Sequence, residues 1–154
     1  MNTSRMKDLM ENIRNPAWVS FAWFGMTAGI SLLETPVKFT APSITREVAL
    51  DVGRVVFAAL NKAELIALIL LLILVRISGR SRELFGFCAA LAVILIAQTA
   101  WLLPELNARA QSIIQGVEPG PSIAHGAYSV LELLKLLVLL YLGFRSMNRT
   151  ASPA

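Results

Sequence analysis

The sequence is poor in the residues that metal and thiol chemistry use, with one cysteine and one histidine among 154 residues. Cys88 alone cannot form an internal disulfide, and without a CxxC pair the thiol content does not reveal the compartment. A b-type haem on His125 would need a methionine or a second chain's histidine as its other axial ligand. Cys88 is expected too far in depth from His125 to share a metal. No metal site is predicted, and any cofactor is unknown.

Catalytic motifs are scarce as well. Ser129 follows His125 by four residues on one helical face, but no glycine-rich elbow or set of oxyanion donors accompanies them. Enzymatic activity stays open, and we favour its absence. Nucleic-acid binding is not expected despite a net charge of +4, because the basic residues lie at the ends of apolar segments and form no patch with aromatic stacking partners.

Apolar residues are abundant, at 56% of the chain, compared with about 45 to 50% in soluble domains. They fall in four segments, each long enough to cross a bilayer, which takes about 20 mostly apolar residues. The sequence therefore predicts one all-α membrane domain over residues 1–154, a polytopic four-helix bundle. Its helices are expected at about 17–34, 43–76, 84–104 and 122–145.

Basic residues are distributed unequally between the connections of these helices. Three, Lys38, Arg46 and Arg109, fall on one side, with Arg54 near the boundary, whereas eight fall on the other. The positive-inside rule then predicts that both termini are cytoplasmic, in a plasma membrane such as the bacterial inner membrane. The eight residues are Arg5, Lys7, Arg14, Arg76, Arg80, Arg82, Arg145 and Arg149.

Prolines and glycines mark the connections. Pro36 is predicted to end the first helix, with a turn after it and Ser43 as the cap of the second helix. Apolar residues at helical spacing predict a short amphipathic helix at about 105–116, lying on the outer interface. Gly25 and Gly29 form a GxxxG motif, which we expect to pack the first helix inside the subunit.

Ionisable residues lie near the predicted membrane centre in two helices. Glu64 is in the second helix, and Glu132 and Lys135 are in the fourth. A charge at that depth costs at least about 2.5 to 3.5 kcal/mol, so such groups face the bundle interior, pair with one another, and often mark a functional path. Glu64 and Lys135 lie within roughly 5 Å of one level at 1.5 Å per residue. They are the best candidate ion pair.

A polar track is predicted from this pair to the outer surface. His125, Tyr128 and Ser129 share a helical face with Glu132 and Lys135. A second cluster is expected further out, where Glu34, Asp51, Arg54 and His125 reach one level. The candidate ligand-binding residues are Glu34, Asp51, Arg54, Asn61, Glu64, Gln98, His125, Tyr128, Ser129, Glu132 and Lys135.

Two interpretations of the track stay open. In the first, the charges have a structural role alone and fix the register of the helices, although one ion pair or one asparagine would do so at lower cost. Alternatively, they line a polar cavity that is open to the outer side and binds or passes a small ligand, ion or proton. His125 titrates nearest neutrality and would then be a pH-sensitive gate or proton acceptor, although a hydrogen-bonded packing role fits it nearly as well.

The second half of the chain resembles a known family. The stretch QTAWLLPELNARAQSIIQGVE, followed by AHGAYS, is similar to transmembrane protein 205-like (DUF4149-type) four-helix membrane proteins. The resemblance covers Trp101, Pro104, His125, Gly126 and Ser129, whereas the first half agrees only in plan. It implies a link to export or tolerance of toxic small compounds and supplies no mechanism. Family counterparts of Glu132 and Lys135 are not established.

The predicted function is that of an integral membrane protein that binds or transports a small solute, ion or proton through a polar intramembrane pocket. Four helices rarely enclose a whole pathway, so a homo-oligomer or a membrane-protein partner in the lipid bilayer is expected. The alternative is an accessory or assembly subunit of a larger membrane complex. Its polar stripe would pack against a partner's helices or hold a cofactor jointly with that partner.

Overall fold

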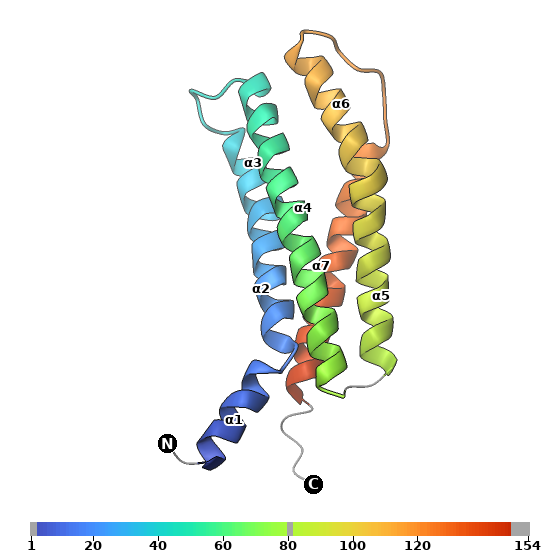
Figure 1. Ribbon diagram of the computed structural model, residues 1–154. Helices are drawn as coiled ribbons and strands as arrows, with labels where there is room; N and C mark the ends of the chain where they lie inside the picture. Colours follow the sequence, from blue (N-terminus) through green and yellow to red (C-terminus); the bar gives the residue numbers. More distant parts are fainter. Residues whose placement is uncertain (1–2, 80–81, 149–154) are drawn as a thin grey trace.

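The computed structural model describes residues 3–79 and 82–148, and within these ranges every regular element is a helix. Four long helical runs lie side by side and alternate in direction, which confirms the predicted all-α bundle (Figure 1). The first and last described helices, α1 (Thr3–Ile13) and α7 (Ala124–Asn148), begin and end respectively at the bottom of Figure 1, whereas the loops after residues 38 and 114 lie at the top. We call the bottom the inner end and the top the outer end.

Nine helical elements form the described part of the chain, and seven of them are α-helices. Two short π-helices, η1 and η2, join α-helices into longer runs. In chain order the elements are α1 (Thr3–Ile13), α2 (Ala17–Ala28), η1 (Gly29–Glu34), α3 (Thr35–Lys38), α4 (Arg46–Ile77), α5 (Arg82–Ala97), η2 (Gln98–Leu102), α6 (Leu103–Ile114) and α7 (Ala124–Asn148).

Proline does not end the first helix where the sequence predicted. Pro36 lies in the first turn of α3 and the helix continues to Lys38, just as Pro104 lies in the first turn of α6. A proline has no N–H for the carbonyl four residues back, and its ring clashes with that carbonyl. A π segment precedes each proline, and its wider turn, with bonds between residues five apart, displaces that carbonyl.

The outer connections also differ in detail from the prediction. Thr45, rather than Ser43, caps α4, because its hydroxyl accepts a hydrogen bond from the Val48 N–H at 3.4 Å. The helix expected at about 105–116 is present as α6, but it is not a separate element on the interface. Through η2 it continues α5 into one helix, Arg82–Ile114, which extends the bundle outward (Figure 1).

Two apolar clusters lie on either side of a polar layer. The larger, inner cluster draws on all four runs and includes Trp23, Leu91 and Leu139, each almost fully buried. The smaller, outer cluster contains Leu102 and Tyr128. Buried glutamates and a lysine lie between these clusters, and apolar packing therefore encloses the charges from both ends.

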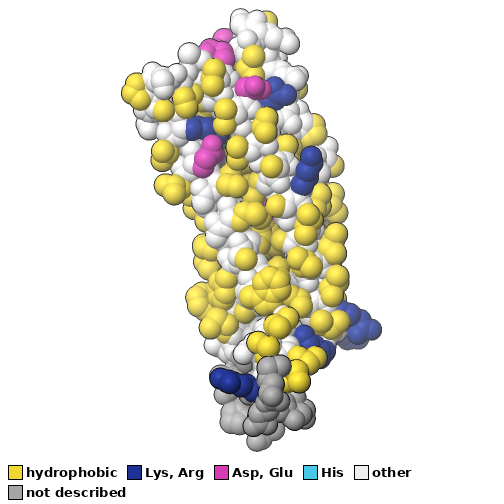
Figure 2. Space-filling model, turned by 60° about the vertical axis from the view of Figure 1, so that its left-hand side comes forward, with side chains coloured by type: hydrophobic (Ala, Val, Ile, Leu, Met, Phe, Trp, Pro, Cys, Tyr) yellow, Lys and Arg dark blue, Asp and Glu magenta, His cyan; other side chains and the backbone are white. Residues whose placement is uncertain are grey.

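Apolar side chains also cover the outside of the bundle. Hydrophobic side chains dominate the middle of the face in Figure 2, with Lys and Arg toward its lower end and both signs of charge toward its upper end. Within the residues that the structure describes, three helices are long and apolar enough to cross a membrane: Arg46–Ile77, Arg82–Ile114 and Ala124–Asn148. The chain is therefore a membrane protein.

The first run is shorter and is divided into parts of 12, 6 and 4 residues. Together these parts are about 33 Å long at 1.5 Å per residue, so the fourth predicted span stays a prediction. Before it, α1 forms a helix that the sequence did not predict and that points away from the inner end (Figure 1). Leu9, Met10 and Ile13 of α1 are each more than half exposed, as in helices that lie on a membrane surface.

The GxxxG motif does not pack inside the subunit, and that prediction was wrong. Gly25 and Gly29 are exposed, and a Cβ added to either would meet nothing within 4 Å. The close approach between helices occurs instead at Gly143 of α7. A Cβ there would lie 2.6 Å from Cζ of Phe21 on α2.

We expect Gly143→Ala to destabilise the bundle by about 1 to 3 kcal/mol, the usual cost of overpacking. The added methyl group would force the Phe21 ring, which also stacks edge-on with Phe144, away from α7. Thermal unfolding of the purified protein in detergent measures the effect. Gly126→Ala in the same helix is the control, because a Cβ there meets nothing within 4 Å; equal destabilisation of both variants would contradict the packing argument.

Candidate functional site

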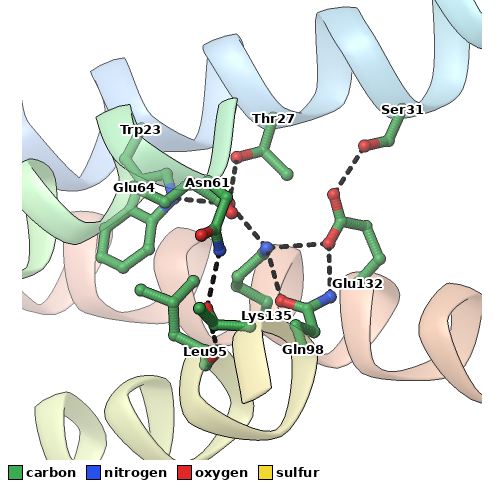
Figure 3. A network of polar contacts seen from close by, with 10 residues as sticks. Trp23, Thr27, Ser31, Asn61, Glu64, Leu95, Gln98, Glu132 and Lys135 are labelled. Atoms are coloured by element: carbon green, nitrogen blue, oxygen red, sulfur yellow. Dashed lines mark hydrogen bonds and ion pairs between the residues drawn. The ribbon is translucent and has the colours of Figure 1, made fainter. Parts of the chain in front are cut away.

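Lys135 lies at the centre of a buried network in which all four helical runs meet (Figure 3). Its ammonium group is 2.6 Å from Oε1 of Glu64 and 2.7 Å from Oε2 of Glu132. It also donates a hydrogen bond of 2.9 Å to Oε1 of Gln98. Three acceptors match the three N–H groups of an ammonium, and the Lys135 side chain is 0% exposed.

Glu64 connects this ammonium to the first helical run. Trp23 Nε1 donates to its Oε1 at 2.9 Å, and the Thr27 hydroxyl donates to the same atom at 3.0 Å. Trp23 and Thr27 are four residues apart on α2 and therefore face the same neighbour. The predicted pair of Glu64 and Lys135 is present, and two donors from α2 hold its carboxylate in place (Figure 3).

Glu132 is held by residues from both π-helical segments. Ser31 of η1 donates a hydrogen bond to its Oε1 at 2.5 Å, and Gln98 Nε2 of η2 donates to its Oε2 at 2.8 Å. Gln98 thus bridges Lys135 and Glu132 with its two amide atoms. π-Helical segments occur often at functional sites, and here both direct a polar side chain to one carboxylate.

Asn61 extends the polar layer beside this network. Its Nδ2 donates to the Thr99 hydroxyl at 2.8 Å, and that hydroxyl donates to the Leu95 carbonyl at 2.7 Å. Asn61 and Glu64 are three residues apart on α4, and Glu132 and Lys135 are three apart on α7, so each pair shares a helical face. Local spacing therefore places these polar groups at one level of the bundle.

The network carries unequal charge. It contains two carboxylates, Glu64 and Glu132, and one ammonium, Lys135, and each side chain is at most 5% exposed. If all three groups are ionised, the net charge is negative by one. A buried charge without a compensating counter-charge is costly.

A cavity of about 170 Å³ lies on the outer side of the network, between α3, α4, α6 and α7. Arg54, His125 and Tyr128, three of the predicted site residues, line it. The Tyr128 ring packs edge-on against Phe57, with ring centroids 5.7 Å apart. Because Tyr128 precedes Glu132 by about one helical turn, these two rings form the part of the wall nearest the buried charges.

The predicted outer cluster does not form. Glu34 pairs with Lys38, at 3.4 Å from its ammonium, and Asp51 pairs with Arg54 at 3.1 Å on the same helix. Each acid thus contacts a base three or four residues away, because side chains at this spacing are neighbours on the surface of a helix. Neither acid lines the cavity with His125.

Ser129 lies apart from the site. It is exposed, and its hydroxyl donates to the His125 carbonyl of its own helix at 3.0 Å. The polar stripe predicted on the fourth helix therefore divides into a buried part, Tyr128, Glu132 and Lys135, and an exposed part, His125 and Ser129. The neighbouring helices cover only part of the face of α7 that these five residues were predicted to share.

Sequence reasoning missed five polar contributors. Three of them, Trp23, Thr27 and Ser31, follow one another at intervals of four residues in the first helical run, and this stripe was a usable signal. Thr99 and Lys38 gave no usable signal. A threonine among apolar residues and a lysine in a predicted loop are both common, so neither points to a site. Within the described residues there is no group of three or more His, Cys, Asp or Glu side chains that could hold a metal ion.

No protein-family model, curated protein or solved structure matches this chain. The resemblance to transmembrane protein 205-like proteins therefore stays a prediction.

We expect Lys135→Met to destabilise the protein by about 3 to 5 kcal/mol, because it leaves two buried carboxylates without their ammonium. Glu64→Gln should cost less than about 1.5 kcal/mol. It balances the charge, and its amide oxygen can occupy the Oε1 position, where all three donors converge. Thermal unfolding in detergent compares the two variants.

Lys62→Met serves as the control for this comparison, because Lys62 is an exposed lysine of α4. Equal losses of stability in Glu64→Gln and Lys135→Met would show that the negative charge of Glu64 is needed. That result would contradict an excess of one negative charge in the network.

Proposed function

We propose that this chain is an integral membrane protein that binds a small solute in its outer cavity and takes up a proton at the buried cluster of Glu64, Glu132 and Lys135. The buried cluster would pass this proton on across the membrane. The observation that carries the proposal is the excess of one buried carboxylate over the buried ammonium.

A structural role alone does not require this excess. One balanced pair, or one asparagine, can fix the register of packed helices. A second carboxylate that shares the same ammonium adds a group whose charge must be neutralised in the low-dielectric interior. We infer that two carboxylates facing one ammonium form a site that can load and release a proton or a cation.

The contacts of Glu132 support it as the first acceptor from the outer side. Its Oε1 is 2.5 Å from the Ser31 hydroxyl, a separation typical of a charge-assisted hydrogen bond. Ser31 precedes Thr35 by about one turn, and Thr35 lines the cavity together with Tyr128. The hydroxyl groups of Thr35 and Ser31 therefore lie between the cavity and Glu132, where a proton would pass.

Proton movement can be tested in liposomes that contain the purified protein and a pH-sensitive dye. Under an imposed membrane potential we expect the wild-type protein to change the internal pH. Glu132→Gln should abolish this flux, because the amide cannot take up the proton, and Ser31→Ala should slow it. Glu118→Gln, whose side chain is 73% exposed on the outer loop, should leave the flux at its wild-type rate.

Two results would contradict this proposal. One is a flux of protons that persists unchanged in Glu132→Gln. The other is a wild-type protein that is folded in liposomes, as its unfolding curve shows, and yet moves no protons at any imposed potential.

We further propose that the inner end faces the cytoplasm of a plasma membrane and that the chain forms a homo-oligomer. Arg14, Arg76, Arg82 and Arg145 lie at or near the inner end, which supports this orientation through the positive-inside rule. Two further residues of that count, Arg80 and Arg149, lie outside the described residues. The exposed GxxxG motif of the first run offers a face for close helix contact between subunits.

One observation favours the accessory-subunit alternative. Lys62 is exposed on α4 two residues before the buried Glu64, among apolar side chains such as Leu65 and Ile66. It forms no ion pair within the described part of the chain. A lysine at this depth would be stabilised by a carboxylate of a partner's transmembrane helix.

Lys62→Leu separates the two roles. If a partner covers Lys62, the substitution should lower the amount of the chain in cells, because the complex is lost, without lowering the unfolding temperature of the purified chain. If Lys62 only lies in lipid, its replacement by leucine should leave the amount unchanged or raise it, since insertion becomes more favourable by about 3 kcal/mol. Immunoblots of membranes and thermal unfolding provide both measurements.

A further inference from the structure

The outer cavity has a charged lining of one sign. Its charged residues are Lys38 and Arg54, and no acidic residue is among those that line it. The carboxylates of Glu34 and Asp51 contact Lys38 and Arg54 from outside the cavity wall. The cavity therefore presents positive side chains to whatever occupies it.

Lys38 is held against the cavity although its ammonium is weakly paired. The side chain is 9% exposed, and its nitrogen is 3.4 Å from Glu34 Oε2. A Cβ on Gly53 would lie only 2.9 Å from this nitrogen, so the absence of a side chain at Gly53 makes the room that the ammonium occupies. One long contact leaves donor capacity on a group that has three N–H bonds.

Arg54 also has an unused donor. Its Nη1 donates to Asp51 Oδ1 at 3.1 Å, while its Nε is buried and has no hydrogen-bond partner within the described residues. Leaving a buried donor of a charged group unpaired is unfavourable. An anionic oxygen in the cavity would satisfy it, since guanidinium groups suit carboxylates and phosphates.

The rest of the lining is apolar. Leu50, Phe57, Leu103 and Leu106 contribute to the wall, and Lys38 lies 5.9 Å from the centroid of the Phe57 ring. A cavity of about 170 Å³ is comparable to an engineered cavity of about 150 Å³ that binds benzene. It has room for a small anionic group with part of an apolar body, and a longer chain would extend out of it.

We propose that the outer cavity binds an amphiphilic anion, a carboxylate or phosphate group attached to an apolar chain or ring. Lys38 and Arg54 would bind the anionic group, and Phe57 with the leucines would contact the apolar body. This inference deepens the proposed function by naming the class of its solute. It concerns binding alone, so it is tested without reference to proton movement.

Calorimetric titration of the full chain in phosphatidylcholine nanodiscs tests the proposal. Octanoate and octyl phosphate should bind, while octanol and inorganic phosphate should each bind at least about tenfold more weakly, since each lacks one half of the recognised chemistry. Arg54→Gln should weaken octanoate binding by at least about tenfold, because a charge-assisted hydrogen bond is lost. Gly53→Ala should also weaken it, because the new methyl group displaces the Lys38 ammonium.

Arg46→Gln is the matched control, because Arg46 lies on the same helix, pairs with Glu118 at 2.8 Å and does not line the cavity. It should bind octanoate with wild-type affinity. The proposal is overturned if octanol binds as tightly as octanoate, if the wild-type protein binds neither anion, or if Arg54→Gln and Lys38→Gln both retain wild-type affinity.

A second series identifies the source of the anion. In nanodiscs that contain phosphatidic acid, competition with octanoate would identify a lipid headgroup as the occupant, whereas unchanged octanoate affinity would identify a free amphiphile; either result supports the proposed chemistry. If octanoate binds but no proton flux is measured, the proposed function is contradicted and the anion site stands. If the wild-type protein moves protons but binds neither anion, the anion site is contradicted and the proposed function stands.

Discussion

The fold and the candidate site depend on one ammonium group shared between neighbouring helices. Lys135 reaches acceptors on α4, η2 and its own helix α7, and the two carboxylates it contacts are tied in turn to the first helical run. A fully buried lysine is stable only when its donors are all paired. Its environment therefore fixes the rotation and the level of all four runs relative to one another.

Apolar packing and the polar layer have different roles in this arrangement. Leucines and Trp23 fill the inner end of the bundle, but apolar contacts in lipid give little preference for one helix orientation over another, because lipid tails are as apolar as leucine. The polar layer supplies that preference. Ser31 and Gln98 reach Glu132 from π-helical segments, so irregular backbone and buried charge occur at the same place.

The buried cluster and the outer cavity differ in the sign of their charged side chains. Lys38 and Arg54 give the cavity a positive, partly apolar lining, whereas Glu64 and Glu132 give the layer beneath it an excess of acid. This difference in charge is the basis of the proposed anion site in the cavity and of the proposed proton site in the cluster.

The sequence by itself determined the all-α bundle and the pairing of Glu64 with Lys135. The length of an apolar run and the rise of 1.5 Å per residue decide where a helix crosses and at what level each charge lies. Helix ends were less predictable, because the π segments before Pro36 and Pro104 depend on hydrogen bonds that no residue pattern encodes. Only the tertiary structure decided which hydroxyls serve the site. Ser129 donates to a carbonyl of its own helix, whereas Ser31 donates to Glu132 of a neighbouring helix. A serine hydroxyl can form a hydrogen bond with its own backbone, so the arrangement of the neighbouring helices decides which partner it takes.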